Sequence, residues 1–94
     1  SRYSQHPGPA DVLFLVEVSD TSYHYDRYVK LPLYARAGVS EVWIVDLRHD
    51  VIEVFRQPSW SGYGSAQQIE RGGTVSPLAF PDVILTAAEV LPPP

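Results

Sequence analysis

The amino-acid sequence predicts an α/β (α+β) domain built around a mixed sheet. Two continuous apolar runs, residues 12–18 and 42–46, flank a segment with helical character. This strand–helix–strand order favours a right-handed crossover between two parallel strands. A return strand after the short turn LRHD adds an antiparallel hairpin. The expected order is therefore strand, helix, strand and hairpin strands.

Size, charge and cysteine content exclude several classes of protein. The chain has 94 residues, 7 basic and 11 acidic side chains, a net charge of −4 and no cysteine. We expect residues 1–94 to form a single domain, without a disulfide framework, a thiolate zinc site or a cysteine nucleophile. Lack of cysteine suits a cytoplasmic location. No apolar stretch reaches the ~20 residues of a membrane helix, so no membrane partner is expected.

The first strand is expected at about residues 12–18. It follows a loop segment at residues 1–10, which contains proline and glycine, and Asp11 opens it. Leu13, Leu15 and Glu17 share one face by the two-residue period of a strand. The other face is also apolar, which predicts an interior strand covered on both sides.

A helix is predicted from about Tyr23 to Ala37, ended by Gly38. Residues 19–22, SDTS, offer several possible helix caps. Pro32 has no N–H to donate to the carbonyl of Tyr28, so we expect a kink or a restart of the helix there.

The remaining elements are short. No second long helix covers the other face of the sheet, which leads us to expect structure upstream of Ser1. The predicted elements are strands at 42–46, 51–56 and about 63–70, a turn at 72–73, an extended segment at 78–85, a helix that starts in a capping box at 86–89, and a proline-rich tail at 91–94.

Three charged residues near the first strand are candidates for a site. Glu17 interrupts an apolar run, and Asp26 and Lys30 follow at a helical spacing of four. Glu17 could equally be a solvated charge at a strand end. Asp26 and Lys30 could form an ordinary surface ion pair. Asp46 could simply begin the turn after its strand.

Other polar and aromatic residues give weaker signals. His6, His24 and His49 lack the paired spacing of a zinc site, so zinc is not expected. Tyr23, Tyr25 and Tyr28 could form a stacking platform, but aromatic residues on a helix are more often packing residues. No glycine-rich phosphate loop and no basic face is evident, which counts against strong non-specific binding of nucleic acid by these residues.

The stretches VEVS, D-x-x-x-K, YARAGVSEVWIVD and LAFPDVIL, in this order and spacing, resemble the Uma-two family of restriction-endonuclease-like proteins. The resemblance runs through nearly the whole chain. It implies a fold of the PD-(D/E)XK nuclease superfamily and a Mg²⁺-dependent endonuclease that acts on nucleic acid, with DNA the expected substrate.

The resemblance also implies roles for individual residues. Glu17 would be the second metal-binding carboxylate and the acid of the E-x-K pair. Ser19 stands where the lysine of that pair would be, and Lys30 matches a lysine moved into the following helix. Asp26 would support Lys30. Mg²⁺ suits such a site because it prefers oxygen ligands and keeps several waters.

The first metal-binding aspartate of the family precedes the segment that matches this chain. Asp11 is not assigned to the metal, because an extended strand would separate it from Glu17 by roughly 20 Å. We therefore expect the chain to be the C-terminal half of a nuclease-like domain, inactive by itself. The alternative is a non-catalytic interaction domain that keeps the fold. A homodimer is also plausible, because exposed strands seek partners.

Overall fold

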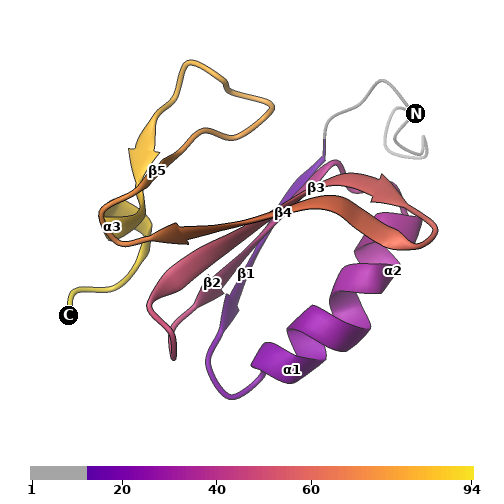
Figure 1. Ribbon diagram of the computed structural model, residues 1–94, viewed down its shortest axis with the longest axis horizontal. Coiled ribbons are helices and arrows are strands. Elements are labelled where there is room, and N and C mark those ends of the chain that lie inside the picture. The colour runs from indigo at the N-terminus through magenta and orange to yellow at the C-terminus, as the bar shows by residue number, and fades with distance from the viewer. Residues whose placement is uncertain (1–12) are drawn as a thin grey trace, which may run out of the picture.

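A four-stranded mixed sheet organises residues 13–94, the part of the chain that the computed structural model describes. β1 runs parallel to β2, and the β2–β3 and β3–β4 pairs are antiparallel (Figure 1). The predicted parallel crossover pair, hairpin and mixed sheet are confirmed. The strands, in their order across the sheet, are β1 (Phe14–Ser19), β2 (Glu41–Asp46), β3 (Val51–Ser59) and β4 (Gly62–Glu70).

One helical segment crosses a single face of this sheet (Figure 1). It is made of α1 (Tyr23–Tyr25), the π-helical turn η2 (Asp26–Lys30) and α2 (Leu31–Arg36). In the widened turn, the N–H of Leu31 donates to the carbonyl of Asp26, five residues back. α2 begins at Leu31 directly after this turn, with Pro32 in its first turn, so the predicted restart of the helix is found as a change from π-helical to α-helical bonding. Gly38, with φ of +80°, ends the segment as predicted.

Apolar side chains pack on both faces of the central strands. The cluster beneath the helical segment consists of Leu31, Val39, Val42, Ile44 and Phe55. The cluster on the opposite face consists of Trp43, Val45, Ile52, Val54, Ile69, Val75, Ala87 and Leu91. The last three come from the small C-terminal unit of β5 (Thr74–Val75), β6 (Leu85–Thr86) and α3 (Ala87–Val90), with Leu91 directly after α3. Cover for β2 and β3 thus comes from the chain's own C-terminal unit, which corrects the expectation that upstream structure must supply it.

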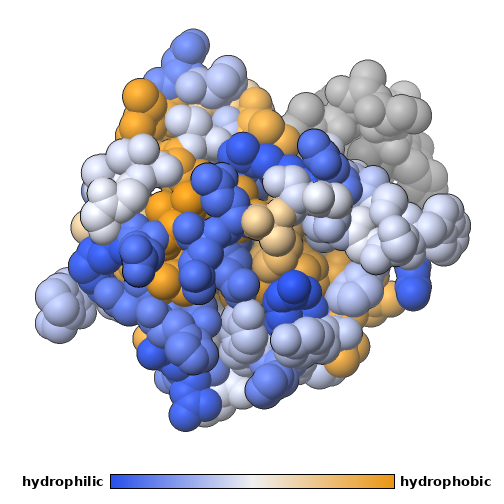
Figure 2. All heavy atoms as spheres, in the orientation of Figure 1, coloured by the Kyte–Doolittle hydropathy of each residue, from blue (hydrophilic) through white to orange (hydrophobic). Residues whose placement is uncertain are grey.

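β1 is an edge strand of the described sheet, and the prediction of a strand buried on both faces is wrong. Within residues 13–94, β1 pairs with β2 only. Leu15, Val16 and Val18 keep exposed fractions of 36%, 43% and 63%. Apolar composition predicts a covered strand, but the strand order decides whether neighbours are present to cover it. Figure 2 shows hydrophobic residues exposed between hydrophilic ones on the face that it presents.

The C-terminal unit confirms one prediction and corrects another. Thr86 and Glu89 form the predicted capping box, with the Thr86 N–H and hydroxyl donating to Glu89 Oε1 at 3.1 and 2.9 Å. The segment at 78–85 is not extended, because the N–H of Phe80 donates to the Pro77 carbonyl and the N–H of Val83 to the Phe80 carbonyl. Pro81 fixes φ at the second position of this latter turn, which favours a turn over a strand.

The predictions for the loop segment at 1–10 and for Asp11 fall outside the described residues. Within 13–94, no helix is long and apolar enough to cross a membrane.

Candidate functional site

Glu17, Asp26 and Lys30 lie together between β1 and the helical segment. The Lys30 ammonium forms an ion pair with Glu17 Oε2 and lies 3.4 Å from Asp26 Oδ1. The side chains of Lys30 and Glu17 are 32% and 21% exposed, whereas that of Asp26 is 6% exposed. The structure therefore brings the three predicted site residues into one charged cluster, and the Asp26–Lys30 pair is not a surface pair.

Asp26 is a buried carboxylate held by two serine hydroxyls. Ser19 Oγ and Ser22 Oγ donate to Asp26 Oδ2 at 2.5 and 2.9 Å. Burial alone would raise the pKa of Asp26, but these hydrogen bonds and the charge of Lys30 lower it below the usual value for an aspartate. Asp26 is therefore ionised at neutral pH. Ser22, a predicted cap residue, uses its hydroxyl on Asp26 rather than on the helix N-terminus.

Ser19 connects the end of β1 to the helical segment. Glu17 and Ser19 are two residues apart on β1 and therefore face the same side of the sheet. Ser19 is fully buried and binds Asp26, while the cation beside Glu17 comes from the helix as Lys30. A strand end and the next helix thus supply the charges of this cluster.

Tyr34 is a fourth member of the cluster and was not predicted from the sequence. Its hydroxyl donates to Glu17 Oε2 at 2.9 Å. Burial and the Glu17 hydrogen bond raise the pKa of Tyr34, so the phenol keeps its proton. The signal for it was the four-residue spacing of Asp26, Lys30 and Tyr34, which places them on one side of a helix.

The Glu17 carboxylate is engaged at Oε2 and remains partly exposed. Lys30 and Tyr34 both bind Oε2, and the Glu17 side chain is 21% exposed. The hydrogen bond to Glu17 and the charge of Glu17 raise the pKa of Lys30. They outweigh the desolvation by burial, which lowers this pKa, so the amine stays an ammonium. The cluster therefore presents a carboxylate oxygen beside a permanent cation.

This donor set fits one oxygen ligand of a Mg²⁺ ion. Mg²⁺ is commonly held by one or two carboxylates together with waters and substrate phosphates. The partly exposed Glu17 carboxylate could serve as such a ligand, whereas Asp26 is buried and both of its oxygens already have partners. No group of three or more histidine, aspartate or glutamate side chains is placed to hold a metal within the described residues.

The other acidic residues considered from the sequence have structural roles. Asp46 ends β2 and accepts the N–H groups of Arg48 and His49, both at 3.1 Å, as well as a 2.7 Å contact from His49 Nδ1. Its turn role is confirmed. Glu41 was not singled out, yet it is fully buried at the start of β2. It binds the side chains of Trp43 and Arg56, at 2.9 and 2.8 Å, and the N–H of Leu78 at 2.8 Å.

The mixed four-stranded sheet with few helices is compatible with a restriction-endonuclease-like fold. A family model described as "Uma2: Putative restriction endonuclease" matches residues 1–88. The chain therefore belongs to the Uma2 family, which is nuclease-like by this description and confirms the resemblance found in the sequence. Searches of curated proteins and of solved structures found no match.

Proposed function

We propose that this chain carries part of the active site of a Mg²⁺-dependent endonuclease that hydrolyses phosphodiester bonds in nucleic acid, with DNA as the substrate. Membership of the Uma2 family supports a nuclease-like activity. The observation that supports the site is the partly exposed Glu17 carboxylate beside the Lys30 ammonium.

Glu17 binds the metal in this proposal, and Lys30 stabilises negative charge on the phosphate. When bound, Mg²⁺ would lower the pKa of a bound water and stabilise charge on the phosphoryl group. In the hydrolysis, the oxygen of a water bonds to phosphorus, the bond from phosphorus to the leaving oxygen breaks, and that oxygen takes up a proton. The raised pKa of Lys30 favours a role in charge stabilisation over one in proton abstraction.

Asp26 and Tyr34 are positioning residues in this site. Asp26 is anchored by Ser19 and Ser22 and lies beside the Lys30 ammonium. Tyr34 donates to the same Glu17 oxygen that Lys30 binds. Together they hold Lys30 and the Glu17 carboxylate in place, and neither needs to contact substrate.

A second metal-binding carboxylate is part of the proposal. Following the resemblance, we assign this role to an aspartate ahead of Ser1. The edge of β1 that is unpaired within residues 13–94 offers the place for its strand to pair. A homodimer through the same edge and a cytoplasmic location are further predictions.

Cleavage of DNA by the natural protein, including the sequence that precedes Ser1, tests this function. We expect cleavage with Mg²⁺ and none after chelation. Glu17→Gln and Lys30→Gln should each reduce the rate by about 100-fold or more, because each removes a charge that acts on the transition state. Glu70→Gln is the matched control, since Glu70 is exposed at the end of β4. Equal rates for the wild type and both site variants would refute the site assignment.

The alternative is a non-catalytic interaction domain that retains the fold. The observation in its favour is that Lys30 lies against both carboxylates of the cluster, at the position where a metal could bind. Mg²⁺ titration separates the two functions. No binding to the natural protein, or binding unchanged in Glu17→Gln, would favour the interaction domain.

A further inference from the structure

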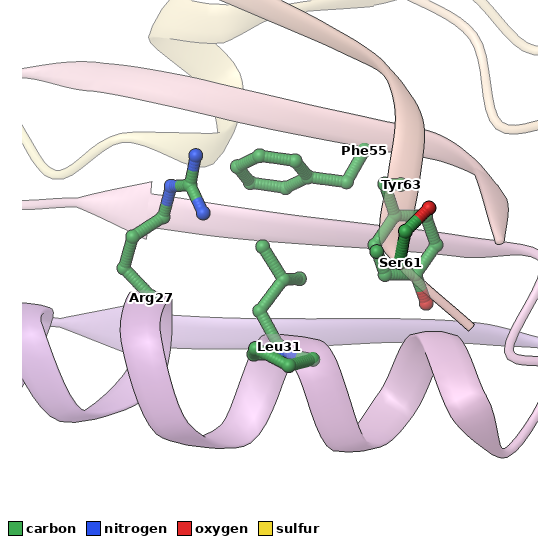
Figure 3. A pocket seen from close by; sticks show the side chains of 7 residues that line it. Arg27, Leu31, Phe55, Ser61 and Tyr63 are labelled. Atoms are coloured by element: carbon green, nitrogen blue, oxygen red, sulfur yellow. The ribbon is translucent and has the colours of Figure 1, made fainter. Parts of the chain in front are cut away.

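A second polar site lies on the other flank of the helical segment, toward β3 and β4. It is a pocket of about 220 Å³ between the helix and the β3–β4 hairpin (Figure 3). The pocket shares no residue with the Glu17 cluster. Its lining consists of Arg27, Leu31, Pro32, Phe55, Ser61, Gly62 and Tyr63.

Arg27 brings a positive charge to this pocket without a carboxylate partner. No aspartate or glutamate among residues 13–94 forms an ion pair with Arg27, in contrast to Lys30, Arg48, Arg56 and Arg71. Glu53 lies two residues before Phe55 on the same face of β3. Its carboxylate accepts the Tyr23 hydroxyl at 2.6 Å and does not bind Arg27.

Aromatic rings hold the Arg27 guanidinium in place. Its central carbon lies 4.9 Å from the ring centre of Phe55 and 5.3 Å from that of Tyr28. Figure 3 shows the guanidinium directed toward the Phe55 ring. Contact with ring faces positions the cation but does not neutralise its charge. The N–H groups at the guanidinium edge therefore remain suited to bidentate binding of an anion.

The remaining polar groups of the pocket add no negative charge. The Tyr63 hydroxyl donates to the Val39 carbonyl at 2.6 Å. Burial raises the pKa of Tyr63 to about 12, so it remains neutral. Ser61 lies at the exposed hairpin end of the pocket, away from Arg27 in Figure 3, and its hydroxyl lies 3.0 Å from that of Ser59. Leu31 and Phe55 are almost fully buried and form the apolar floor.

We propose that this pocket binds a single phosphate group through the Arg27 guanidinium. The phosphate can come from two sources, a nucleic-acid backbone or a small phosphate ester. The first source rests on the proposed nuclease function, and the second does not. Either way, the site is separate from the charged cluster on the other flank of the same helix.

Binding measurements without Mg²⁺ test this site independently of cleavage. The probes are inorganic phosphate, thymidine 5′-monophosphate, thymidine as the phosphate-free control, and a short single-stranded oligonucleotide. Binding is followed by calorimetry and by NMR shifts of the arginine side chains. The variant is Arg27→Gln, and the matched control is Arg36→Gln, which removes the same charge from an exposed position of the same segment.

We expect thymidine 5′-monophosphate to bind and thymidine not to bind. Arg27→Gln should weaken phosphate binding by about tenfold or more, as expected for loss of a charged hydrogen-bond donor, while Arg36→Gln should not. Binding of only the oligonucleotide, with the same selective loss in Arg27→Gln, would identify the backbone as the source and supports the site. Binding of none of the phosphate probes, or equal losses in the two variants, overturns it. A wild-type NMR spectrum outside the pocket checks that Arg27→Gln is folded.

Discussion

The Ser19 hydroxyl on β1 donates a 2.5 Å hydrogen bond to the Asp26 carboxylate on η2. Both side chains are buried, so this bond joins the end of the strand to the first turns of the helix out of contact with water. The geometry of the whole Glu17 cluster depends on that connection, because Lys30 lies one helical turn beyond Asp26.

Replacement of Asp26 should make folding less sensitive to acid. The pKa of Asp26 is lower in the folded protein than its usual value near 3.9, so the folded state binds fewer protons there. The stabilisation is present above that usual value and is lost as pH falls through the folded pKa. Asp26→Asn should cost about 1–3 kcal/mol at pH 7, because it leaves the two serine donors and Lys30 poorly paired.

Urea unfolding at pH 7 and at successively lower pH values checks this. The difference in unfolding free energy between wild type and Asp26→Asn should narrow as the pH drops. Asp20→Asn is the control, because Asp20 is 64% exposed and should show only a small effect at all pH values. A difference that stays constant with pH would contradict the ionised state of Asp26.

Removal of the Lys30 charge should separate metal binding from cleavage. Lys30→Gln frees Glu17 Oε2 and Asp26 Oδ1 from an ammonium that repels a divalent cation. We expect Mg²⁺ to bind about tenfold more tightly, while DNA cleavage falls. Calorimetric titration of the natural protein measures the affinity, with Arg48→Gln as a control for net charge. Weaker Mg²⁺ binding in Lys30→Gln would show that Lys30 supports the site only by holding its shape.

Loss of the Tyr34 hydroxyl should affect the site more than the fold. Tyr34→Phe removes the 2.9 Å hydrogen bond to Glu17 and should reduce Mg²⁺ affinity and cleavage several-fold, at a cost in stability of about 0.5–1.5 kcal/mol. Tyr23→Phe is the matched control, since it removes a comparable tyrosine–glutamate bond to Glu53. A positioning role predicts that Tyr34→Phe and Tyr23→Phe lose similar stability, but that only Tyr34→Phe loses Mg²⁺ affinity. Equal Mg²⁺ affinities of the two variants would refute this role.

The end of the helical segment offers a test of backbone conformation alone. Gly38 has φ of +80°, and a Cβ added there would meet no atom within 4 Å. Gly38→Ala should therefore cost about 1 kcal/mol through backbone strain, without any clash. Gly72→Ala meets equally open space without a positive φ and should be nearly neutral. Thermal unfolding of both variants measures the difference, and equal midpoints would argue against the left-handed conformation at Gly38.

Local chemistry made the strands, the helix end and the capping box predictable from the sequence. Each of these elements depends on residues close together in the sequence. The strands depend on the apolar runs, the helix end on Gly38, and the capping box on the spacing of Thr86 and Glu89. The edge position of β1 was not predictable, because an apolar strand has the same composition whether or not a neighbour covers it. The turns at 78–83 were mistaken for extended chain because Pro81 is compatible with both.

The sequence singled out the three residues of the charged cluster, Glu17, Asp26 and Lys30, but not the contacts between them. Glu17 and Lys30 came from a resemblance, and their contact depends on a crossover that places a helix over a strand end. Tyr34 and Glu41 acquire their partners only in the folded chain: Tyr34 reaches Glu17, and Glu41 reaches Arg56 and Leu78. Such long-range pairings leave no local signal in one sequence.

The π-helical turn at Asp26–Lys30 makes the length of this segment as important as its composition. Ordinary α-helical bonding over the same eight residue steps from Asp26 to Tyr34 would turn the two side chains about 80° apart, because each residue of an α-helix adds about 100°. Asp26 and Tyr34 could then no longer face β1 together. Related chains that preserve the charged cluster should therefore either keep the widened turn or lack one residue of it.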